Sequence, residues 1–326
     1  MAEEREGEGG ECENELAHGI FLSDICKNNA IFVEISDSVM RICVIGGANV
    51  DITATSARAF QIGDSNPGRV NVSWGGVGRN IAHNLALLGD EVEFLTIFGG
   101  GPFAPLISSS CRSIGLGTEH CEMAPEGANA FFVSVNNADG ELVGGIADMN
   151  ATERMTPQWL SSRLDVINAA DVVVADANSS AESLAWLIDN CTKPLYLDAV
   201  SVAKASRIRD AVALSSRKSF FALKCNALEY EVLMGMEAEI CRKYVSVGAE
   251  GLRVECDGRL YEFPALPCIV RNVTGGGDAL LAGIVHAGPE ADIAESARMG
   301  LLCARCAVES PDAVSEEISY YVCIPE

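Results

Sequence analysis

The sequence predicts an α/β fold in which a mostly parallel sheet lies between two layers of helices and carries a small β lid. Three observations support this fold class. Short apolar segments rich in β-branched residues alternate with longer segments of helical periodicity. Glycines separate the two kinds of segment, and two further segments with strand-like alternation interrupt the order. Strands that alternate with helices form parallel sheets that are covered on both faces.

The expected elements begin at residue 41. Arg41–Ile45 is a short apolar run ended by Gly46 and Gly47, and we expect a strand there. Residues 78–88 carry apolar side chains at helical spacing, and Gly89 follows as a stop signal. The next strand is expected at residues 92–98. Further strands are expected at 172–175, 195–197, 220–224 and 244–247.

The two interrupting segments are residues 53–74 and 131–145. Each contains turn signals, such as Asn66-Pro67-Gly68 in the first. We interpret them as hairpins that form a lid over the carboxyl ends of the strands, where ligands bind in open α/β sheets. We assign residues 40–326 to one domain and interpret residues 1–39 as an acidic, disordered N-terminal extension.

Composition and charge exclude several classes of partner. The formal net charge is −23 and no basic residues cluster, so nucleic acid is not an expected partner. No apolar stretch approaches the roughly 20 residues that span a membrane. The first 15 residues carry seven Glu against one Arg, the wrong sign for a targeting segment. The 13 cysteines are an odd number in mostly apolar contexts, which favours reduced thiols and a cytoplasmic protein. Import into an organelle stays open.

The strongest chemical signal is the run from Asn272 to Gly283. Three successive glycines, Gly275, Gly276 and Gly277, precede an apolar helix that starts after Asp278. Glycines allow a tight turn whose N–H groups, together with the helix N-terminus, form an anion site. A carboxylate there could accept a proton from an attacking hydroxyl while a phosphoryl group is transferred. Taken alone, the motif fits equally a glycine-rich helix start with Asp278 as an ordinary cap.

Polar residues near the first expected strand suit a sugar. Asn49 and Asp51 follow that strand and can hydrogen-bond to hydroxyl groups, although Asp51 could equally close a turn. Gly75 and Gly76 would let a substrate approach the backbone, and Asn80 can both donate and accept a hydrogen bond. These five residues are candidates for substrate binding.

Asn226 and Glu229 form a separate pair at an expected helix start. They lie one turn apart on the same face of the helix. A carboxylate in this place could hold Mg²⁺ through water. The alternative is a helix cap followed by a surface acid.

Taken together, the motifs resemble both signatures of the ribokinase-like (PfkB) carbohydrate and nucleoside kinases. The first is residues 75–82 with Leu88-Gly89, and the second is residues 272–283. The resemblance extends from Arg41 to the C-terminus. It implies a ribokinase-like three-layer αβα core with a β lid, ATP as co-substrate and Mg²⁺ as cofactor. It also implies a homodimer paired through the lid.

The resemblance assigns roles to individual residues. It makes Asp278 the general base and places Gly275, Gly276 and Gly277 in an anion hole. Glu229 would hold Mg²⁺ through water. The residues implied to bind ATP are Asn226, Ser246, Gly248 and Gly251. Those implied to bind the substrate are Asn49, Asp51, Gly75, Gly76 and Asn80.

Within the family, residues 46–52, 66–68 and 73–80 are similar to those of pseudouridine kinases. This implies transfer of the γ-phosphoryl group of ATP to the 5′-hydroxyl of pseudouridine. The alternatives are another ribose-like acceptor (adenosine, ribose or a ketohexose) and a non-catalytic scaffold with the same fold. Three residues depart from the family pattern, and one of them is Ala199, which stands where a proline is expected. Gly276 stands where alanine is usual, and Asn272 replaces an acidic residue beside a monovalent cation, so activation by K⁺ stays open.

Overall fold

Eight strands form the central sheet of the computed structural model, which describes residues 39–322. The strand order is β14-β13-β12-β11-β10-β9-β1-β4. The six strands from β12 to β4 run parallel, and β13 and β14 add an antiparallel hairpin at one edge. The strands are β1 (Arg41–Ile45), β4 (Glu91–Leu95), β9 (Val172–Asp176), β10 (Leu195–Asp198), β11 (Ser219–Asn226), β12 (Glu239–Ser246), β13 (Leu252–Cys256) and β14 (Arg259–Phe263).

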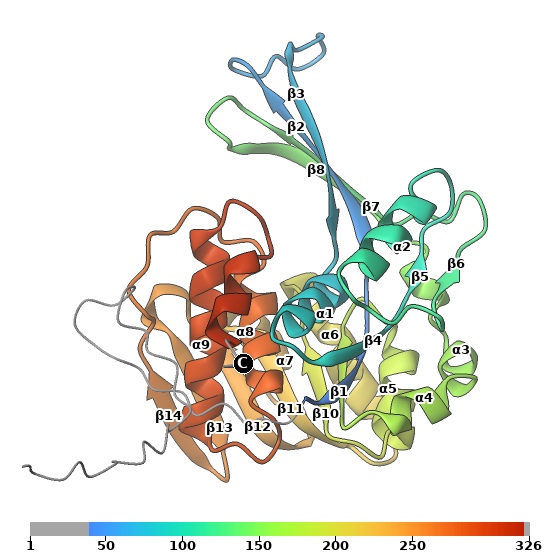
Figure 1. Cartoon of the computed structure of the whole chain (residues 1–326), viewed down its shortest axis with the longest axis vertical. Coiled ribbons are helices and arrows are strands. Elements are labelled where there is room, and N and C mark those ends of the chain that lie inside the picture. The colour runs from blue at the N-terminus through green and yellow to red at the C-terminus, as the bar shows by residue number, and fades with distance from the viewer. Residues whose placement is uncertain (1–38, 323–326) are drawn as a thin grey trace, which may run out of the picture.

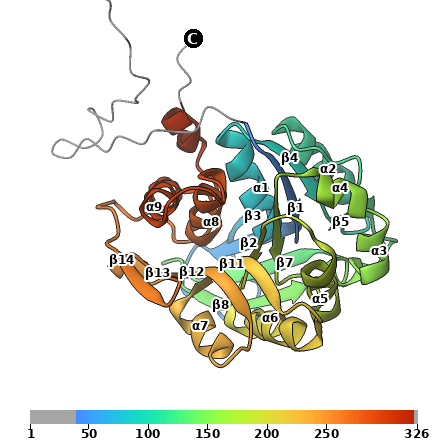
Figure 2. The same ribbon diagram turned by 90° about the horizontal axis from the view of Figure 1, so that it is seen from below.

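Helices cover both faces of this sheet, with α1, α8 and α9 on one side and α5, α6 and α7 on the other (Figures 1 and 2). Successive residues of a strand therefore enter different cores. Val172 and Val174 pack under α1, α8 and α9, whereas Val173 and Ala175 pack under the helices of the opposite face. The helices are α1 (Val77–Leu87), α2 (Ala104–Ser113), α3 (Pro157–Ser161), α4 (Leu164–Ala169), α5 (Ala181–Asn190), α6 (Val202–Leu214), α7 (Ala227–Leu233), α8 (Gly276–His286) and α9 (Ile293–Glu309). Three short 3₁₀ helices are η1 (Thr152–Arg154), η2 (Gly248–Glu250) and η3 (Glu316–Val322).

A separate four-stranded sheet projects from the carboxyl ends of the core strands (Figure 1). We call it the lid sheet. Its order is β3-β2-β7-β8, and its strands are β2 (Asn49–Ser56), β3 (Gly68–Gly75), β7 (Phe131–Asn136) and β8 (Leu142–Asp148). Strand β2 starts four residues after β1 ends, so the lid sheet stands directly above the central sheet.

The three-layer core and the additional β sheet agree with the predicted fold class, but some elements differ from expectation. The strand expected at 92–98 is divided, because Ile97–Phe98 (β5) leaves the central sheet and pairs with Glu122–Met123 (β6). Strand β12 begins at Glu239, five residues before the expected start, because its partly exposed first half pairs with β11 without entering the apolar core. The β13–β14 hairpin had no counterpart in the expectation.

The structure does not test two of the expectations. The proposed extension, residues 1–39, lies outside the described residues except for Val39. The proposed lid segments, 53–74 and 131–145, fall within the strands and turns of the lid sheet, and the domain assignment stays a prediction. Between residues 39 and 322, no helix is both long and apolar enough to cross a bilayer.

Candidate active site

The two glycine motifs meet where α1 packs against α8. Gly275 has a φ of +83°, in the left-handed region, and α8 starts directly after it. A Cβ at this position would overlap the carbonyl oxygen of Ala313, so the turn requires glycine. Asp278 lies in the first turn of α8, and its Oδ2 accepts a 2.9 Å hydrogen bond from Nδ2 of Asn80 in α1. A predicted base and a predicted substrate ligand are therefore in direct contact.

The environment of Asp278 increases its affinity for a proton. The side chain is 8% exposed, and burial raises the pKa of its carboxyl group to about 7. The nearby carboxylate of Asp198 raises the pKa further, whereas the ammonium group of Lys224 and the hydrogen bond from Asn80 lower it. A carboxylate with a pKa near neutrality is a stronger general base than an ordinary aspartate.

Lys224 and Asp198 form a buried ion pair beside Asp278. Nζ of Lys224, on β11, lies 2.9 Å from Oδ2 of Asp198, the last residue of β10. Burial would lower the pKa of Lys224, but the carboxylates of Asp198 and Asp278 outweigh this effect and hold the pKa above its ordinary value. A Cβ at Gly277 would lie 2.7 Å from Nζ, so the ammonium group touches the first turn of α8. A fixed positive charge therefore adjoins the predicted anion hole.

Asp176, the last residue of β9, links the turn at Gly47 to the turn at Gly78, on the side of the site that is expected to bind the sugar. Its Oδ2 accepts hydrogen bonds from the backbone N–H groups of Gly47 (3.0 Å) and Gly78 (2.8 Å). A Cβ at Gly46 would lie 2.9 Å from Cα of Gly78, which shows how closely the two turns approach. The carboxylate also accepts two bonds from Asn178. Asp176 thus orders the start of α1 and, with it, Asn80.

The remaining predicted sugar ligands lie together at the base of the lid sheet. Asn49 donates a 2.5 Å hydrogen bond from Nδ2 to Oδ1 of Asp51, and Asn49 is paired with Gly75 across β2 and β3. A Cβ at Gly75 would overlap the carboxylate of Asp51, and Gly76 has a φ of +104°. Burial raises the pKa of Asp51 to about 6, partly opposed by the hydrogen bond from Asn49.

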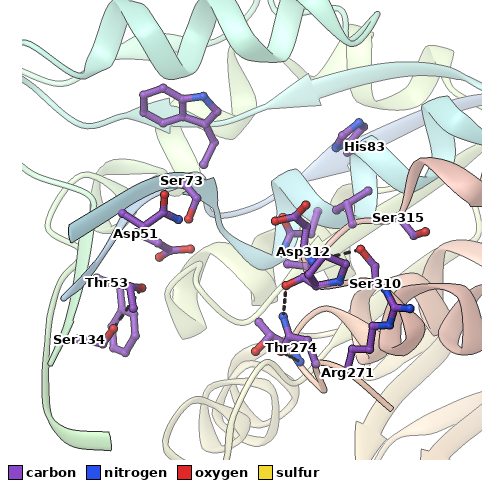
Figure 3. A pocket seen from close by; sticks show the side chains of 18 of the residues that line it. Asp51, Thr53, Ser73, His83, Ser134, Arg271, Thr274, Ser310, Asp312 and Ser315 are labelled. Atoms are coloured by element: carbon purple, nitrogen blue, oxygen red, sulfur yellow. Dashed lines mark hydrogen bonds between the residues drawn. The ribbon is translucent and has the colours of Figure 1, made fainter. Parts of the chain in front are cut away.

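A cavity of about 1240 Å³ opens above these residues, with Asp51 and Asn80 in its lining. Figure 3 shows Asp51, Thr53 and Ser134 of the lid sheet facing Thr274, Ser310 and Asp312 across this space. The far wall therefore comes from the segment before α8 and from the segment after α9. The volume exceeds that of typical small-molecule pockets and leaves room for a nucleoside.

The predicted ATP ligands lie at the ends of β11 and β12. Asn226 and Ser246 are paired across these strands, and Gly248 and Gly251 follow in the next turn with positive φ angles of 59° and 111°. A Cβ at Gly251 would overlap the carbonyl oxygen of Phe263. None of these four residues lines the cavity beside the lid sheet.

Asn226 and Glu229 form a helix cap, as the alternative interpretation of this pair expected, but Glu229 is not a surface acid. Glu229 receives hydrogen bonds from the backbone and side-chain nitrogens of Asn226, and its own N–H donates to Oδ1 of Asn226. Glu229 is buried, which raises its pKa. Within residues 39–322 no three His, Cys, Asp or Glu side chains are arranged to hold a metal ion. Mg²⁺ retains several waters and is held by one or two carboxylates plus phosphates, so the free lone pairs of Glu229 fit a water-mediated contact.

The sequence matches the model of the pfkB family of carbohydrate kinases over residues 40–318. The chain belongs to this family. This kinase is 31% identical over 286 residues to the pseudouridine kinase of Escherichia coli strain K12, covering 82% of this chain and 90% of that protein. It is 30% identical over 280 residues to an uncharacterised sugar kinase of the same strain, YeiI, covering 80% of this chain and 76% of that protein.

A solved structure supports the fold. The Arabidopsis thaliana ribokinase complexed with ribose and ATP has a TM-score of 0.74, covers 87% of this chain and 99% of its own, and is 18% identical. The predicted family and the ribokinase-like three-layer fold are confirmed. The kinase is a phosphotransferase with a hydroxyl acceptor.

Lys224, Asp198 and Asp176 are residues of the site that the sequence motifs did not predict. A signal was present, because each lies at or within two residues of the end of a neighbouring parallel strand, next to an apolar run. Charged residues at carboxyl ends of adjacent strands converge on one edge of the sheet. The strand order needed to recognise them as neighbours comes from the fold.

Proposed function

We propose that this kinase transfers the γ-phosphoryl group of ATP to the 5′-hydroxyl of pseudouridine, with Asp278 as the general base. The hydrogen bond between Asn80 and Asp278 carries the proposal, because it joins the residue that would accept the proton to the motif that would hold the sugar. The similarity to the E. coli pseudouridine kinase supports the choice of acceptor.

The chemistry follows from the arrangement around α8. The acceptor hydroxyl loses its proton to Asp278, its oxygen forms a bond to the γ-phosphorus, and the bond from that phosphorus to the bridging oxygen breaks to release ADP. Charge on the migrating group would be stabilised by the N–H groups of Gly275, Gly276 and Gly277, by the N-terminus of α8 and by Lys224. The lid sheet would exclude water, which could otherwise accept the phosphoryl group.

The donor side is assigned to the ends of β11 and β12. We place ATP against Asn226, Ser246, Gly248 and Gly251, with Mg²⁺ held by the phosphates and, through water, by Glu229. Mg²⁺ would neutralise phosphate charge during transfer.

The hydrogen bonds of Asn272 bear on whether this kinase needs a monovalent cation for turnover. Its Nδ2 donates to the carbonyl oxygen of Pro311 at 3.1 Å, and its Oδ1 accepts from the N–H of Thr274 at 3.0 Å. The side-chain amide thus joins the segment before α8 to the segment after α9 through its own hydrogen bonds. We propose that turnover does not require K⁺, which exchanging K⁺ for a tetraalkylammonium salt at constant ionic strength would test.

The lid sheet also suggests a homodimer. Its face directed away from the cavity carries exposed apolar side chains, among them Val70 (69% exposed), Val72 (44%) and Ile146 (72%). Such a face is usually covered by a partner. We propose that a second copy of this chain covers it. We also propose a cytoplasmic location, supported by the ten cysteines described as free thiols.

An ADP-release assay with Mg-ATP tests the function on pseudouridine, uridine, adenosine, ribose and fructose in parallel. Strong turnover on pseudouridine with little on uridine is the expected result. The sugar kinase relative makes a free sugar the second candidate acceptor. Preference for ribose would retain the kinase assignment and overturn the acceptor, and no turnover with intact ATP binding would favour a non-catalytic scaffold.

A further inference from the structure

The cavity-facing side of the lid sheet presents three parallel rows of side chains. Because strands β2, β3 and β7 pair in register, alternate residues line up across the sheet. Three residues form each row. The inner row is Asp51, Ser73 and Phe132, the middle row is Thr53, Asn71 and Ser134, and the outer row is Thr55, Arg69 and Asn136.

The spacing between the rows along the strands matches the spacing between the ribose and the base of a nucleoside. The inner row contains Asp51, one of the residues expected to bind the sugar, and we take this row as the ribose site. The middle row lies two positions from the inner row in each strand, which is roughly 6–7 Å at the usual rise per residue. This offset is about that between the ribose ring of a nucleoside and its base. A nucleoside whose ribose contacts Asp51 would therefore place its base at Thr53, Asn71 and Ser134.

The middle row offers hydrogen-bonding groups that the protein leaves available. Thr53 and Ser134 share a 3.2 Å hydrogen bond, with the Ser134 hydroxyl as donor. The Thr53 hydroxyl proton is therefore available for a ligand. Among residues 39–322, the side-chain amide of Asn71 has no intramolecular hydrogen bond, although it lines the cavity. A carboxamide places a C=O acceptor next to N–H donors. It is complementary to a ring edge with an adjacent N–H and C=O, such as that of uracil, which a free pentose does not have.

An aromatic ring lies beside this polar row. Phe132 of the inner row is 37% exposed within the cavity lining. A Cβ at Gly145 would lie 3.4 Å from its ring, so glycine at that position leaves the adjacent part of the ring uncovered. Bases stack on aromatic side chains in many nucleic-acid-binding proteins. The inner row thus offers a ring on which a base could stack, and the adjacent middle row offers hydrogen-bonding groups for the edge of that base.

We propose that Thr53, Asn71 and Ser134 form a subsite that recognises the hydrogen-bonding edge of a pyrimidine base, with Phe132 against its face, and that this subsite selects a nucleoside over a free pentose. The inference rests on the proposed function, because it takes the inner row as the ribose site.

The test replaces Asn71 by leucine, which has a similar size and no hydrogen-bonding group. Asn71→Leu is expected to lower kcat/KM for pseudouridine about 10–100-fold and to leave kcat/KM for ribose within twofold of wild type, because only the nucleoside carries the base edge. Asn136→Leu is the matched control, since it makes the same change one row further out and should leave both values within twofold. Thr53→Val removes one hydroxyl and is expected to act in the same direction as Asn71→Leu.

A second measurement separates recognition from a structural effect. Methylation of the substrate at the ring nitrogen of the recognised edge should reduce kcat/KM in wild type by about the same factor as Asn71→Leu, and should cause little further loss in that variant. Equal losses on pseudouridine and ribose, or no difference between Asn71→Leu and Asn136→Leu, would overturn the inference. If wild type does not phosphorylate nucleosides, the proposed function itself has failed, and this result is obtained before any variant is made.

Discussion

Nδ2 of Asn80 donates a 2.9 Å hydrogen bond to Oδ2 of Asp278, joining residues separated by 198 positions in the chain. Oδ1 of Asn80 is buried and has no partner within residues 39–322, and Asn80 lines the cavity. A buried acceptor without a donor is costly. A ligand hydroxyl other than the one that gives its proton to Asp278 would supply that donor, so the geometry suits an acceptor with more than one hydroxyl group.

Replacement of Asp278 by asparagine tests the base directly. Asp278→Asn keeps the shape of the side chain and removes its ability to accept a proton. We expect kcat to fall by about 10²–10⁴-fold in the ADP-release assay, the usual contribution of general base catalysis. Asp312→Asn changes another carboxylate of the same cavity and should leave kcat within twofold. Turnover of Asp278→Asn within threefold of wild type would remove Asp278 from the proposed role.

The pH dependence of kcat/KM follows from the raised pKa of Asp278, which is about 7. Only the ionised carboxylate can accept a proton, so kcat/KM should decrease as the pH falls below about 7. The hydrogen bond from Asn80 stabilises the ionised form and lowers this pKa. Asn80→Ala should therefore move the acidic limb of the profile to higher pH. A limb that stays in place or moves to lower pH would contradict this role of Asn80.

The buried pair of Lys224 and Asp198 is expected to contribute to both stability and catalysis. Lys224→Met leaves Asp198 buried without its cation, and breaking such a pair costs about 3–5 kcal/mol. Urea unfolding would measure the loss. The double variant Lys224→Met with Asp198→Asn removes both charges and should recover much of the stability.

Measurement of kcat separates the contribution of Lys224 to catalysis from its contribution to stability. The ammonium group adjoins Gly277 in the predicted anion hole, so the double variant should remain at least tenfold below wild type in kcat even where its stability has recovered. Recovery of activity together with stability would show that Lys224 acts only through folding.

Gly275 lies in the turn before α8, and Gly140, in the turn between β7 and β8, is a matched control for its substitution. Both have positive φ angles, +83° and +87°, but a Cβ at Gly140 meets no atom within 4 Å, whereas one at Gly275 overlaps the carbonyl oxygen of Ala313. Each change to alanine incurs the backbone strain of about 1–3 kcal/mol. Gly275→Ala should lose an additional ~1–3 kcal/mol from overpacking and most of its activity. Equal denaturation midpoints for the two variants would argue against a constrained turn at Gly275.

The proposed dimer can be tested through the outer face of the lid sheet. Ile146→Glu places a charge on the exposed apolar face, and sedimentation velocity should show a shift from dimer to monomer. Leu214→Glu alters an exposed leucine at the end of α6, away from the lid sheet, and should leave the oligomeric state unchanged. A wild-type monomer at micromolar concentration would refute the proposed interface.

Local signals in the sequence were sufficient for the fold class. The apolar period of residues 78–88 and the β-branched run at 41–45 correspond to α1 and β1, because such periodicity reflects which face of an element is buried. The glycine runs before Asn80 and Asp278 were recognisable because few other residues adopt those turns. Each candidate could thus be named from its immediate neighbours in the chain.

The contacts of the site were decided by the tertiary structure. Asn80 meets Asp278, and Lys224 meets Asp198, only because α1 packs against α8 and β10 lies beside β11. The rows of the lid sheet likewise depend on the register of its strands. Periodicity within a segment reports burial, whereas strand order and register depend on packing between segments far apart in the chain. The elements and the chemical groups could therefore be predicted from the chain, whereas packing between distant segments brings those groups together.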